Sequence, residues 1–313
     1  MSISTVSLAI NHPQRVGAGT RRRVAEAAES VGYRSGGATT PRRRAGLRTV
    51  AVAAPFSSWP SYYQRLDGII GRFRDAGIEV LVHDLPSSNA VPAPLLDALP
   101  VRGDLDGVII MGTPLSDTAE SSILRSGLPT VLVDTDSERL PTVMADDRRG
   151  GTMLGEHLLR LGHRRLVFAH DGQASSDYVS AGMRRLDGLR ASVDAEGGTV
   201  EPMRISPGLA ARARETGATV VVANHDALAA RILRDAAVCG IGVPHQLSVT
   251  GYDGGLLAES LALTTIEQPL DVTGRTAAEL LRGLLDGTTP TVRRITLDCR
   301  LVVRETTGPP PRD

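Results

Sequence analysis

Lysine is absent from the sequence, so all 35 of its basic residues are arginines. Cysteine is scarce: Cys239 and Cys299 lie far apart and match no metal-ligand spacing, so we expect two buried free thiols in a reducing compartment. Aromatic residues make up only 3% of the chain, which makes the position of each one informative. No apolar run has the form of a signal peptide or the length of a membrane span. We therefore expect a cytoplasmic protein without membrane contact.

The short motifs of common enzyme classes are also missing. The sequence has no phosphate-binding loop, no GxSxG, no HExxH and no cluster with metal-ligand spacing. We expect no catalytic residue, no cofactor and no metal. An α/β hydrolase is the rival hypothesis, because Asp and His occur at several predicted strand ends, and turnover of a bound ligand would reveal it.

Charge is distributed unevenly along the chain. Residues 1–48 contain nine arginines and two acidic residues, a formal charge of +7, while the whole chain is neutral. A basic arm on a mildly acidic body indicates a polyanionic partner for the arm. The alternative is a solvated basic tail, which the helical periodicity of the same stretch disfavours.

Two short helices are predicted at the N-terminus. The first spans residues 2–11 and is rich in small and hydroxyl side chains, and a turn with Pro13 follows it. The second spans about residues 18–31, carries three arginines in its first turn, faces Val24 inward and ends at Gly32. Hydroxyls and arginines on a short exposed helix suit contact with phosphates and base edges.

Beyond a Gly- and Pro-containing linker, the chain alternates between apolar strands and helices. The predicted strands are residues 49–55, 78–84, 106–112, 128–134, 164–170, 218–224, 247–253 and 263–269, with a final segment at 293–306. The predicted helices are residues 61–76, 93–99, 117–126, 151–161, 178–196, 226–239 and 271–286, and residues 199–217 form only a short segment. This alternation predicts an α/β fold of two doubly wound parallel-sheet subdomains after a small all-α headpiece. We expect the last helix and strand to return to the first subdomain, which leaves a cleft between the two.

Ligands of open α/β sheets bind beyond the carboxyl ends of the strands. Side chains placed at such strand ends are therefore candidates, and they include Phe56, Asp84, Asp134, Asp146, Asp171, His225, Asp226 and Asp253. Carboxylates and the guanidinium of Arg185 can hydrogen-bond ligand hydroxyls in pairs, and a ring such as that of Tyr62 or Tyr63 can stack on an apolar ligand face.

Each candidate also has a purely structural explanation. Asp226 is equally suited to cap the helix that follows it, and Asp146 to form a turn with its neighbour. Asp253 could simply end a strand, and Arg185 could be a surface charge. The two tyrosines could pack in the core.

Motifs along nearly the whole chain resemble those of the lactose-repressor (LacI/GalR) family of bacterial transcription regulators. They are STVSLAIN, VGAGTRRRVAEAAESVGYR, DGVIIMG, LPTVLVD, DDRRGG, HLLRLGHRRLVF, RRLDGLRA, ANHDALA, VPHQLSVTGYD, LTTIEQP and LVVRET, in the family's order and spacing. Each motif alone is weak, but the ordered set is highly specific.

The resemblance implies a homodimeric regulator of the repressor type, whose paired headpieces bind a near-palindromic double-stranded DNA operator. It also implies a core like that of periplasmic sugar-binding proteins, which binds a small-molecule effector. The effector class that we expect first is a sugar or sugar phosphate, and the second is a nucleobase. By position, the implied DNA contacts are Ile3, Ser4 and Leu8 to bases, Thr5, Ser7, Asn11 and Thr20 to phosphates, and Arg15 near the turn. The implied effector contacts are Tyr62, Asp146, Arg185, Asp226, Asp253 and Gln268, to which we add Phe56 at a strand end.

The expected organisation is a partial headpiece at residues 1–34, a hinge at 35–48, an effector-binding core at 49–306 and a tail at 307–313. Within the core, the N-subdomain takes residues 49–146 plus 271–292, and the C-subdomain takes 150–267 plus 300–306.

The chain also departs from the family pattern. It begins where the family's first headpiece helix ends, so either the start is misplaced or the headpiece is truncated, and we expect the chain as written to bind operator poorly. The rival function is a small-molecule-binding module that has lost DNA binding. Arg42 stands where the family's hinge has a leucine wedge, and His225 stands where many relatives have Asn.

Overall fold

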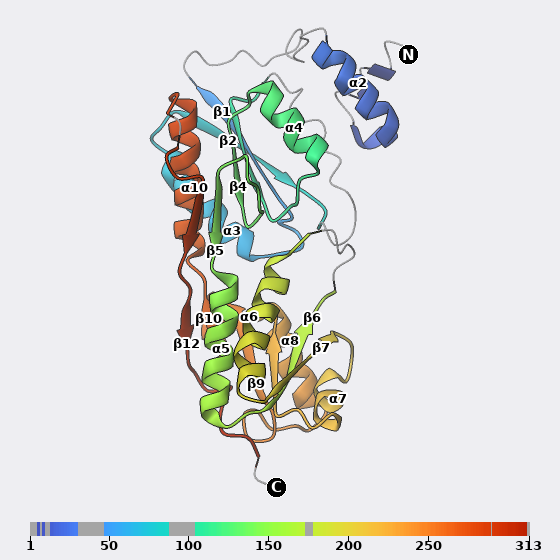
Figure 1. The fold of residues 1–313 in the computed structure, drawn as a ribbon, viewed down its shortest axis with the longest axis vertical. Helices are drawn as coiled ribbons and strands as arrows, with labels where there is room; N and C mark the ends of the chain where they lie inside the picture. The colour runs from blue at the N-terminus through green and yellow to red at the C-terminus, as the bar shows by residue number, and fades with distance from the viewer. Residues whose placement is uncertain are drawn as a thin grey trace. The chain divides into compact units, whose positions relative to one another are not determined.

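The computed structural model describes residues 5–6, 8–9, 13–30, 47–87, 104–172, 178–288 and 290–311 (Figure 1). The chain divides into two compact units. Unit 1 comprises residues 1–144 and 270–295, and unit 2 comprises residues 145–269 and 296–313. In the described part of the chain, no helix combines the length and the apolar character that a bilayer span needs.

The N-terminal region is helical where it is described. Helical residues include Thr5, Leu8 and Ala9, and the short 3-10 helix η1 (Pro13–Arg15) and the helix α2 (Ala18–Ser30) follow. Ala9 and Val24 are only 6% and 5% exposed, so the apolar side of these helices faces inward as predicted.

Unit 1 is built on a six-stranded sheet with the order β11-β5-β4-β3-β1-β2. Its strands are β1 (Arg48–Ala54), β2 (Ile78–Asp84), β3 (Gly107–Met111), β4 (Thr130–Val133), β5 (Thr142–Ala145) and β11 (Arg294–Leu297). The pairs β1–β2, β1–β3, β3–β4 and β4–β5 are parallel. The central strands β3 and β4 are buried throughout, as expected for a parallel sheet covered on both faces.

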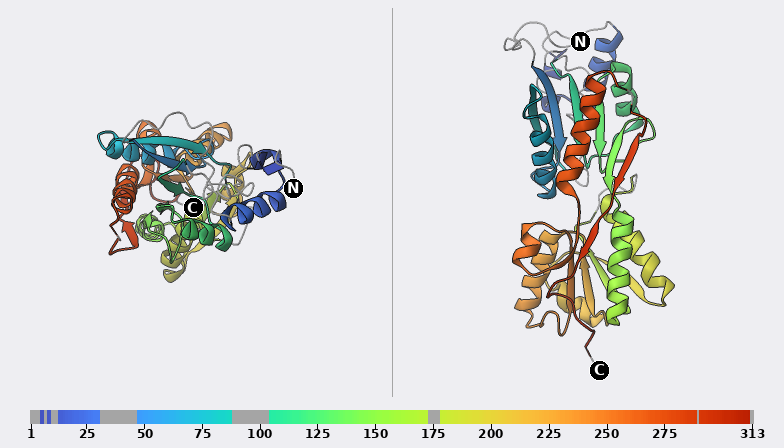
Figure 2. Two further views of the ribbon diagram at one scale, coloured as in Figure 1. Left: turned by 90° about the horizontal axis from the view of Figure 1, so that it is seen from above. Right: turned by 90° about the vertical axis from the view of Figure 1, so that its left-hand side faces the viewer.

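Among the described residues of unit 1, three helices cover this sheet. α4 (Asp117–Ser126) buries Ile123 against the strands, and α3 (Ser61–Phe73) packs against α10 (Leu270–Leu285) (Figure 2). The α3–α10 crossing is so close that a Cβ at Gly274 would lie 1.9 Å from the carbonyl oxygen of Arg65, and one at Gly68 would lie 2.2 Å from that of Asp271. Only glycine permits this approach of two backbones.

Unit 2 repeats the plan with the sheet order β12-β10-β9-β8-β6-β7. Its strands are β6 (Arg165–His170), β7 (Thr199–Arg204), β8 (Val220–Ala223), β9 (Ser248–Asp253), β10 (Thr264–Glu267) and β12 (Arg300–Val302). β12 is antiparallel to β10, and the other pairs are parallel.

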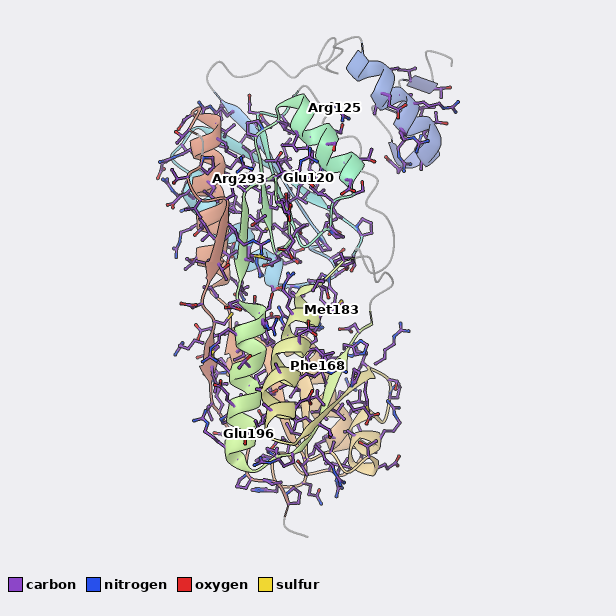
Figure 3. The ribbon with its side chains drawn as sticks, viewed as in Figure 1. Glu120, Arg125, Phe168, Met183, Glu196 and Arg293 are labelled. Carbon is purple, nitrogen blue, oxygen red and sulfur yellow. The ribbon has the colours of Figure 1, made fainter. Side chains whose placement is uncertain are left out.

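Helices cover both faces of the second sheet as well. α5 (Asp147–Leu161) and α6 (Ala181–Ala195) pack on the face that carries Phe168, a buried residue labelled in Figure 3. The helices α7 (Leu209–Glu215), α8 (Asp226–Val238) and α9 (Leu256–Ser260) pack on the opposite face. The α5–α6 crossing again needs glycine, because a Cβ at Gly188 would lie 1.9 Å from the carbonyl oxygen of Arg148.

The predicted α/β fold of two parallel-sheet subdomains is confirmed, and several predicted elements need correction. Residues 199–217 are not merely a short segment, because they form β7 and α7. The helix predicted at 151–161 begins at Asp147, and the strand β5 before it was not expected. The final segment divides: β11 joins the sheet of unit 1, but β12 joins that of unit 2. The helix predicted at 93–99 lies outside the described residues.

One expectation about cysteine is also wrong. Cys239, directly after α8, is exposed, and Cys299 is half-buried rather than fully enclosed. Burial raises the pKa of the Cys299 thiol to about 12, so this group stays protonated at neutral pH.

Candidate functional site

The carboxyl edge of the sheet in unit 2 collects most of the predicted site residues. Because β6, β8, β9 and β10 run parallel, their ends place Asp171, His225, Asp226, Asp253 and Gln268 along one edge. The N-termini of α5 and α6 bring Asp146, Asp147 and Arg185 into unit 2 beside these ends.

Arg185 is a buried group, not a surface charge. Its Nε lies 2.8 Å from Oδ1 of Asp147, and its Nη1 donates to the carbonyl oxygen of Asn224 at 2.6 Å. The guanidinium carbon lies 3.9 Å from the ring centroid of Tyr252, a cation–π distance. Burial alone would lower the pKa of Arg185, but the charge interactions with Asp147, Tyr252 and Asp253 and the hydrogen bond to Asp147 together outweigh burial and raise it. The guanidinium is therefore permanently charged and held in one orientation.

Asp226 is fixed by the strand ends around it. Oδ1 accepts from the Thr265 hydroxyl at 2.7 Å, and Oδ2 accepts from the backbone N–H of Gly254 at 2.8 Å. Burial, together with the negative charge of Asp253, raises the pKa of Asp226 to about 7. The alternative that Asp226 caps α8 is wrong, because the cap is His225, whose Nδ1 accepts from the N–H of Leu228 at 3.1 Å.

Asp253 and Gln268 form a pair at the ends of β9 and β10. Nε2 of Gln268 donates to Oδ1 of Asp253 at 2.7 Å. Asp253 has a φ of 126°, an uncommon backbone conformation for a residue other than glycine. Such strain at a strand end is more typical of a binding site than of a simple strand terminus.

Asp146 has the structural role that the sequence left open. It is the N-cap of α5, where Oδ1 accepts from the N–H of Arg149 at 2.9 Å, and its neighbour Asp147 is the buried partner of Arg185. Asp146 itself remains only half-buried.

The sequence placed Asp171 and His225 at strand ends but did not predict that they pair. Nε2 of His225 lies 2.7 Å from Oδ2 of Asp171, and Arg231 of α8 lies 3.6 Å from Oδ1 of the same carboxylate. The hydrogen bond from His225 is the main cause of the lowered pKa of Asp171. Their places at the ends of neighbouring strands, and the departure of His225 from relatives, were the signals that pointed to this pair.

Unit 1 has its own group of candidates near its strand ends. Phe56, after β1, is 3% exposed, and its ring centroid lies 5.3 Å from that of Tyr63, which is 53% exposed. Tyr62 is half-buried at the start of α3. Asp134, which the sequence placed at a strand end, forms a buried ion pair beside it with Arg65, which the sequence did not indicate, with 2.7 Å between Nη2 and Oδ2.

Of the predicted DNA contacts, four lie among the described residues. Leu8 and Arg15 are exposed, while Thr5 and Thr20 are partly buried. Ile3, Ser4, Ser7, Asn11 and Arg42 lie outside the described residues. In the first turns of α2, Arg22 and Arg23 are exposed, and Arg22 is 3.8 Å from Glu26. In the described ranges, no three His, Cys, Asp or Glu side chains group so as to hold a metal ion.

These two α/β units with polar carboxyl edges define a receptor of the periplasmic-binding-protein type. The family model described as "Periplasmic binding protein-like domain" matches residues 156–307. The model described as "Bacterial regulatory proteins, lacI family" matches residues 1–35. The chain therefore belongs to the LacI family of bacterial regulatory proteins, as its motifs indicated.

Individual relatives agree along the whole chain. The chain is 29% identical to the HTH-type transcriptional regulator DegA of Bacillus subtilis, over 99% of this chain and 95% of the relative. It is 27% identical to the HTH-type transcriptional repressor CytR of Escherichia coli, over 98% of this chain and 93% of the relative.

Solved structures of the family are also similar. A LacI family transcriptional regulator from Enterococcus faecium with bound ribose matches with a TM-score of 0.72 and 26% identity, over 84% of this chain and 99% of that one. The complex of the transcriptional regulator CelR with cellobiose matches with a TM-score of 0.71 and 26% identity, over 98% of this chain and 96% of that one.

Proposed function

We propose that this chain is a ligand-responsive, sequence-specific DNA-binding repressor whose operator affinity is set by a sugar. The observation that carries the proposal is the carboxyl edge of unit 2, where a charged, immobilised Arg185 shares one edge with the Asp253–Gln268 pair. Such fixed donors and acceptors suit the adjacent hydroxyls of a sugar. The sugar-bound relatives support this class of effector.

The proposed effector contacts remain those expected from the sequence. In unit 2 they are Asp146, Arg185, Asp226, Asp253 and Gln268, and in unit 1 they are Phe56 and Tyr62. Since Arg185 is already paired with Asp147, an uncharged sugar fits the edge better than a sugar phosphate. Placement of the effector between the two subdomains stays a prediction from the sequence.

The proposed DNA-binding part is residues 1–34, followed by a hinge at 35–48 that includes Arg42. The excess of arginine in this part supports contact with a polyanion. We also propose that the chain acts as a homodimer, because a near-palindromic operator matches a twofold pair of headpieces. Sedimentation analysis at micromolar concentration tests the dimer.

We propose further that the bound effector is released unchanged. Incubation of the protein with ribose and with cellobiose, followed by proton NMR of the sugar, tests this. Appearance of a new sugar signal that depends on the protein would contradict it.

Trp59 makes a direct test of sugar binding possible. It is the only tryptophan of the chain, and its carbonyl oxygen accepts the backbone N–H of Tyr62 at 3.2 Å, so its emission reports on the proposed aromatic contact in unit 1. The protein is titrated with ribose, cellobiose and other sugars, and with purines as the second class of ligand. Trp59 emission and the Tm of thermal unfolding are measured for each compound.

We expect at least one sugar to change the Trp59 emission and to raise the Tm. A ligand at 100 times its Kd adds about 2.7 kcal/mol of stability. Asp253→Asn should abolish both responses, whereas Asp194→Asn at the exposed end of α6 should leave them intact. Responses to purines alone, or to no compound, would contradict a sugar effector.

A further inference from the structure

Arg65 is the largest fully buried side chain in the described part of unit 1. It lies in the middle of α3 and is only 2% exposed. A buried guanidinium is costly unless a partner compensates its charge. The partner is Asp134, which directly follows β4 and whose side chain is 7% exposed.

Asp134 also departs from ordinary backbone geometry. Its φ is 56°, in the left-handed region that non-glycine residues seldom adopt, although aspartate tolerates it better than most. An uncommon backbone conformation at a strand end suggests that the position of the side chain matters.

Tyr62 is tied to this pair through Arg65. The guanidinium carbon of Arg65 lies 5.3 Å from the centroid of the Tyr62 ring, within the range of a cation–π contact. The tyrosine hydroxyl lies against Gly112, where an added Cβ would be only 1.7 Å from it.

The strand ends close this arrangement into a ring of contacts. Gly112 follows β3, and its N–H donates to the carbonyl oxygen of Val133, the residue before Asp134, at 2.9 Å. The Tyr62 hydroxyl therefore lies against the backbone of Gly112, and the Tyr62 ring lies near the planar guanidinium of Arg65. Asp134 anchors that guanidinium at the end of the neighbouring strand β4.

We propose that Arg65 is a positioning residue of the effector site in unit 1: anchored by Asp134, it sets the orientation of the Tyr62 ring. This inference rests on the proposed function of Tyr62 as an effector contact. Arginine suits the role better than lysine, because its planar group can hold a carboxylate and lie near an aromatic ring at the same time.

The orientation of Tyr62 can be measured without any ligand. The protein is labelled with 3-fluorotyrosine, and the fluorine resonance of Tyr62 is assigned by its loss in Tyr62→Phe. We expect Arg65→Met and Asp134→Asn to move the Tyr62 resonance by more than its linewidth and to leave those of Tyr178 and Tyr252 in place. Arg65→Lys should restore part of the original shift.

The matched control is Arg72→Met on the same helix. Nε of Arg72 lies 3.1 Å from Oε1 of Glu279 of α10 on the surface, and Arg72 lies about three helical turns beyond Tyr62 on α3. It should move no tyrosine resonance. An unchanged Tyr62 resonance in folded Asp134→Asn or Arg65→Lys would overturn the proposal, and these two variants keep it testable if Arg65→Met does not fold.

Sugar affinity supplies the second measurement. For the sugar with the largest Trp59 response, we expect Arg65→Lys and Asp134→Asn to weaken binding by about tenfold, the size of one cation–π contact, and Arg72→Met to leave it unchanged. If Tyr62 moves but affinity does not, the positioning of an effector contact is overturned. If the wild-type protein binds no sugar, the proposed function fails, whereas the fluorine experiment still decides whether Arg65 orients Tyr62.

Discussion

Each unit brings together an arginine, an aspartate and a tyrosine, but the partners of the arginine differ between unit 1 and unit 2. In each unit an arginine pairs with a buried aspartate near the carboxyl edge of the sheet and lies close to a tyrosine ring. In unit 2 the aspartate is on helix α5, and Arg185 also donates to the backbone after β8. In unit 1 the aspartate is on the strand end itself, and Arg65 contacts a tyrosine of its own helix.

The difference separates two tasks. Arg185 has partners on three sides, so unit 2 presents a rigid edge whose charge is already compensated. Arg65 forms an ion pair with Asp134 at the end of β4, so the orientation of Tyr62 in unit 1 should respond to this carboxylate. We infer that the edge of unit 2 supplies fixed hydrogen bonds, whereas that of unit 1 supplies an adjustable aromatic contact.

The largest expected effect comes from breaking the pair in unit 2. Asp147→Asn leaves the charge of Arg185 uncompensated in the interior and should lower the free energy of unfolding by about 3–5 kcal/mol. Urea unfolding followed by circular dichroism measures it. Arg149→Met, which removes an exposed ion pair of the same helix, is the control and should cost at most about 1 kcal/mol. Equal losses in both variants would mean that Arg185 is not held by Asp147.

The glycine crossings should give intermediate effects of similar size in both units. Gly188→Ala in unit 2 and Gly274→Ala in unit 1 each place a methyl group within 2 Å of a backbone carbonyl oxygen of the partner helix. Each should lower stability by about 1–3 kcal/mol. Gly71→Ala has open space around it on α3 and should instead stabilise by roughly 0.5–1 kcal/mol. A neutral Gly274→Ala would show that the α3–α10 crossing relaxes where the α5–α6 crossing does not.

The smallest effect concerns pH and belongs to unit 2. Burial lowers the pKa of His163, whose ring bridges the Thr219 hydroxyl and the carbonyl oxygen of Gly308. Burial also lowers the pKa of His157. The two imidazoles bind protons more readily in the unfolded chain than in the folded one. The contribution of the neutral imidazoles to the free energy of unfolding is therefore complete above about pH 6.5 and declines as the pH falls below it.

Chemical unfolding at pH 7.5 and 5.5 measures this decline. The raised pKa of Asp226 acts in the opposite sense, so the comparison is made between the wild type and His163→Gln. The variant should lose less stability on acidification. An identical loss of stability in both proteins would mean that His163 and its two hydrogen bonds do not cause the sensitivity to acid.

Much of the fold could be predicted because its signals are local. Apolar strands, and glycines such as Gly127 and Gly162 in left-handed conformations at helix ends, marked most elements correctly. β7 was missed because it is an edge strand with a proline, Pro202, and an exposed acidic residue. The start of α5 was placed too late because the glycines at its beginning, needed for close packing on α6, weaken the local helix signal.

The site was predictable only in part, for a related reason. Strand ends can be located from sequence, so Asp226 and Asp253 were expected at this edge, whereas Gln268 was expected only from the family resemblance. The ion pair of Arg65 joins residues distant in sequence, and nothing in the local pattern of α3 signals the burial of its arginine. His225 was expected at a strand end, but its role as the cap of α8 was not, because an imidazole is not among the preferred helix caps.

The central claim is that sugar binding and operator binding are coupled, and one measurement tests it most directly. A DNA sequence is selected by the protein from a random pool at micromolar protein concentration and low salt, because the chain as written is expected to bind operator weakly. The selected DNA is labelled, and its Kd is measured by fluorescence anisotropy with and without a saturating sugar that changes Trp59 emission. The account predicts enrichment of a near-palindromic sequence and a change of about 5–150-fold in its Kd. A selected operator whose Kd is the same with and without the bound sugar would contradict the account.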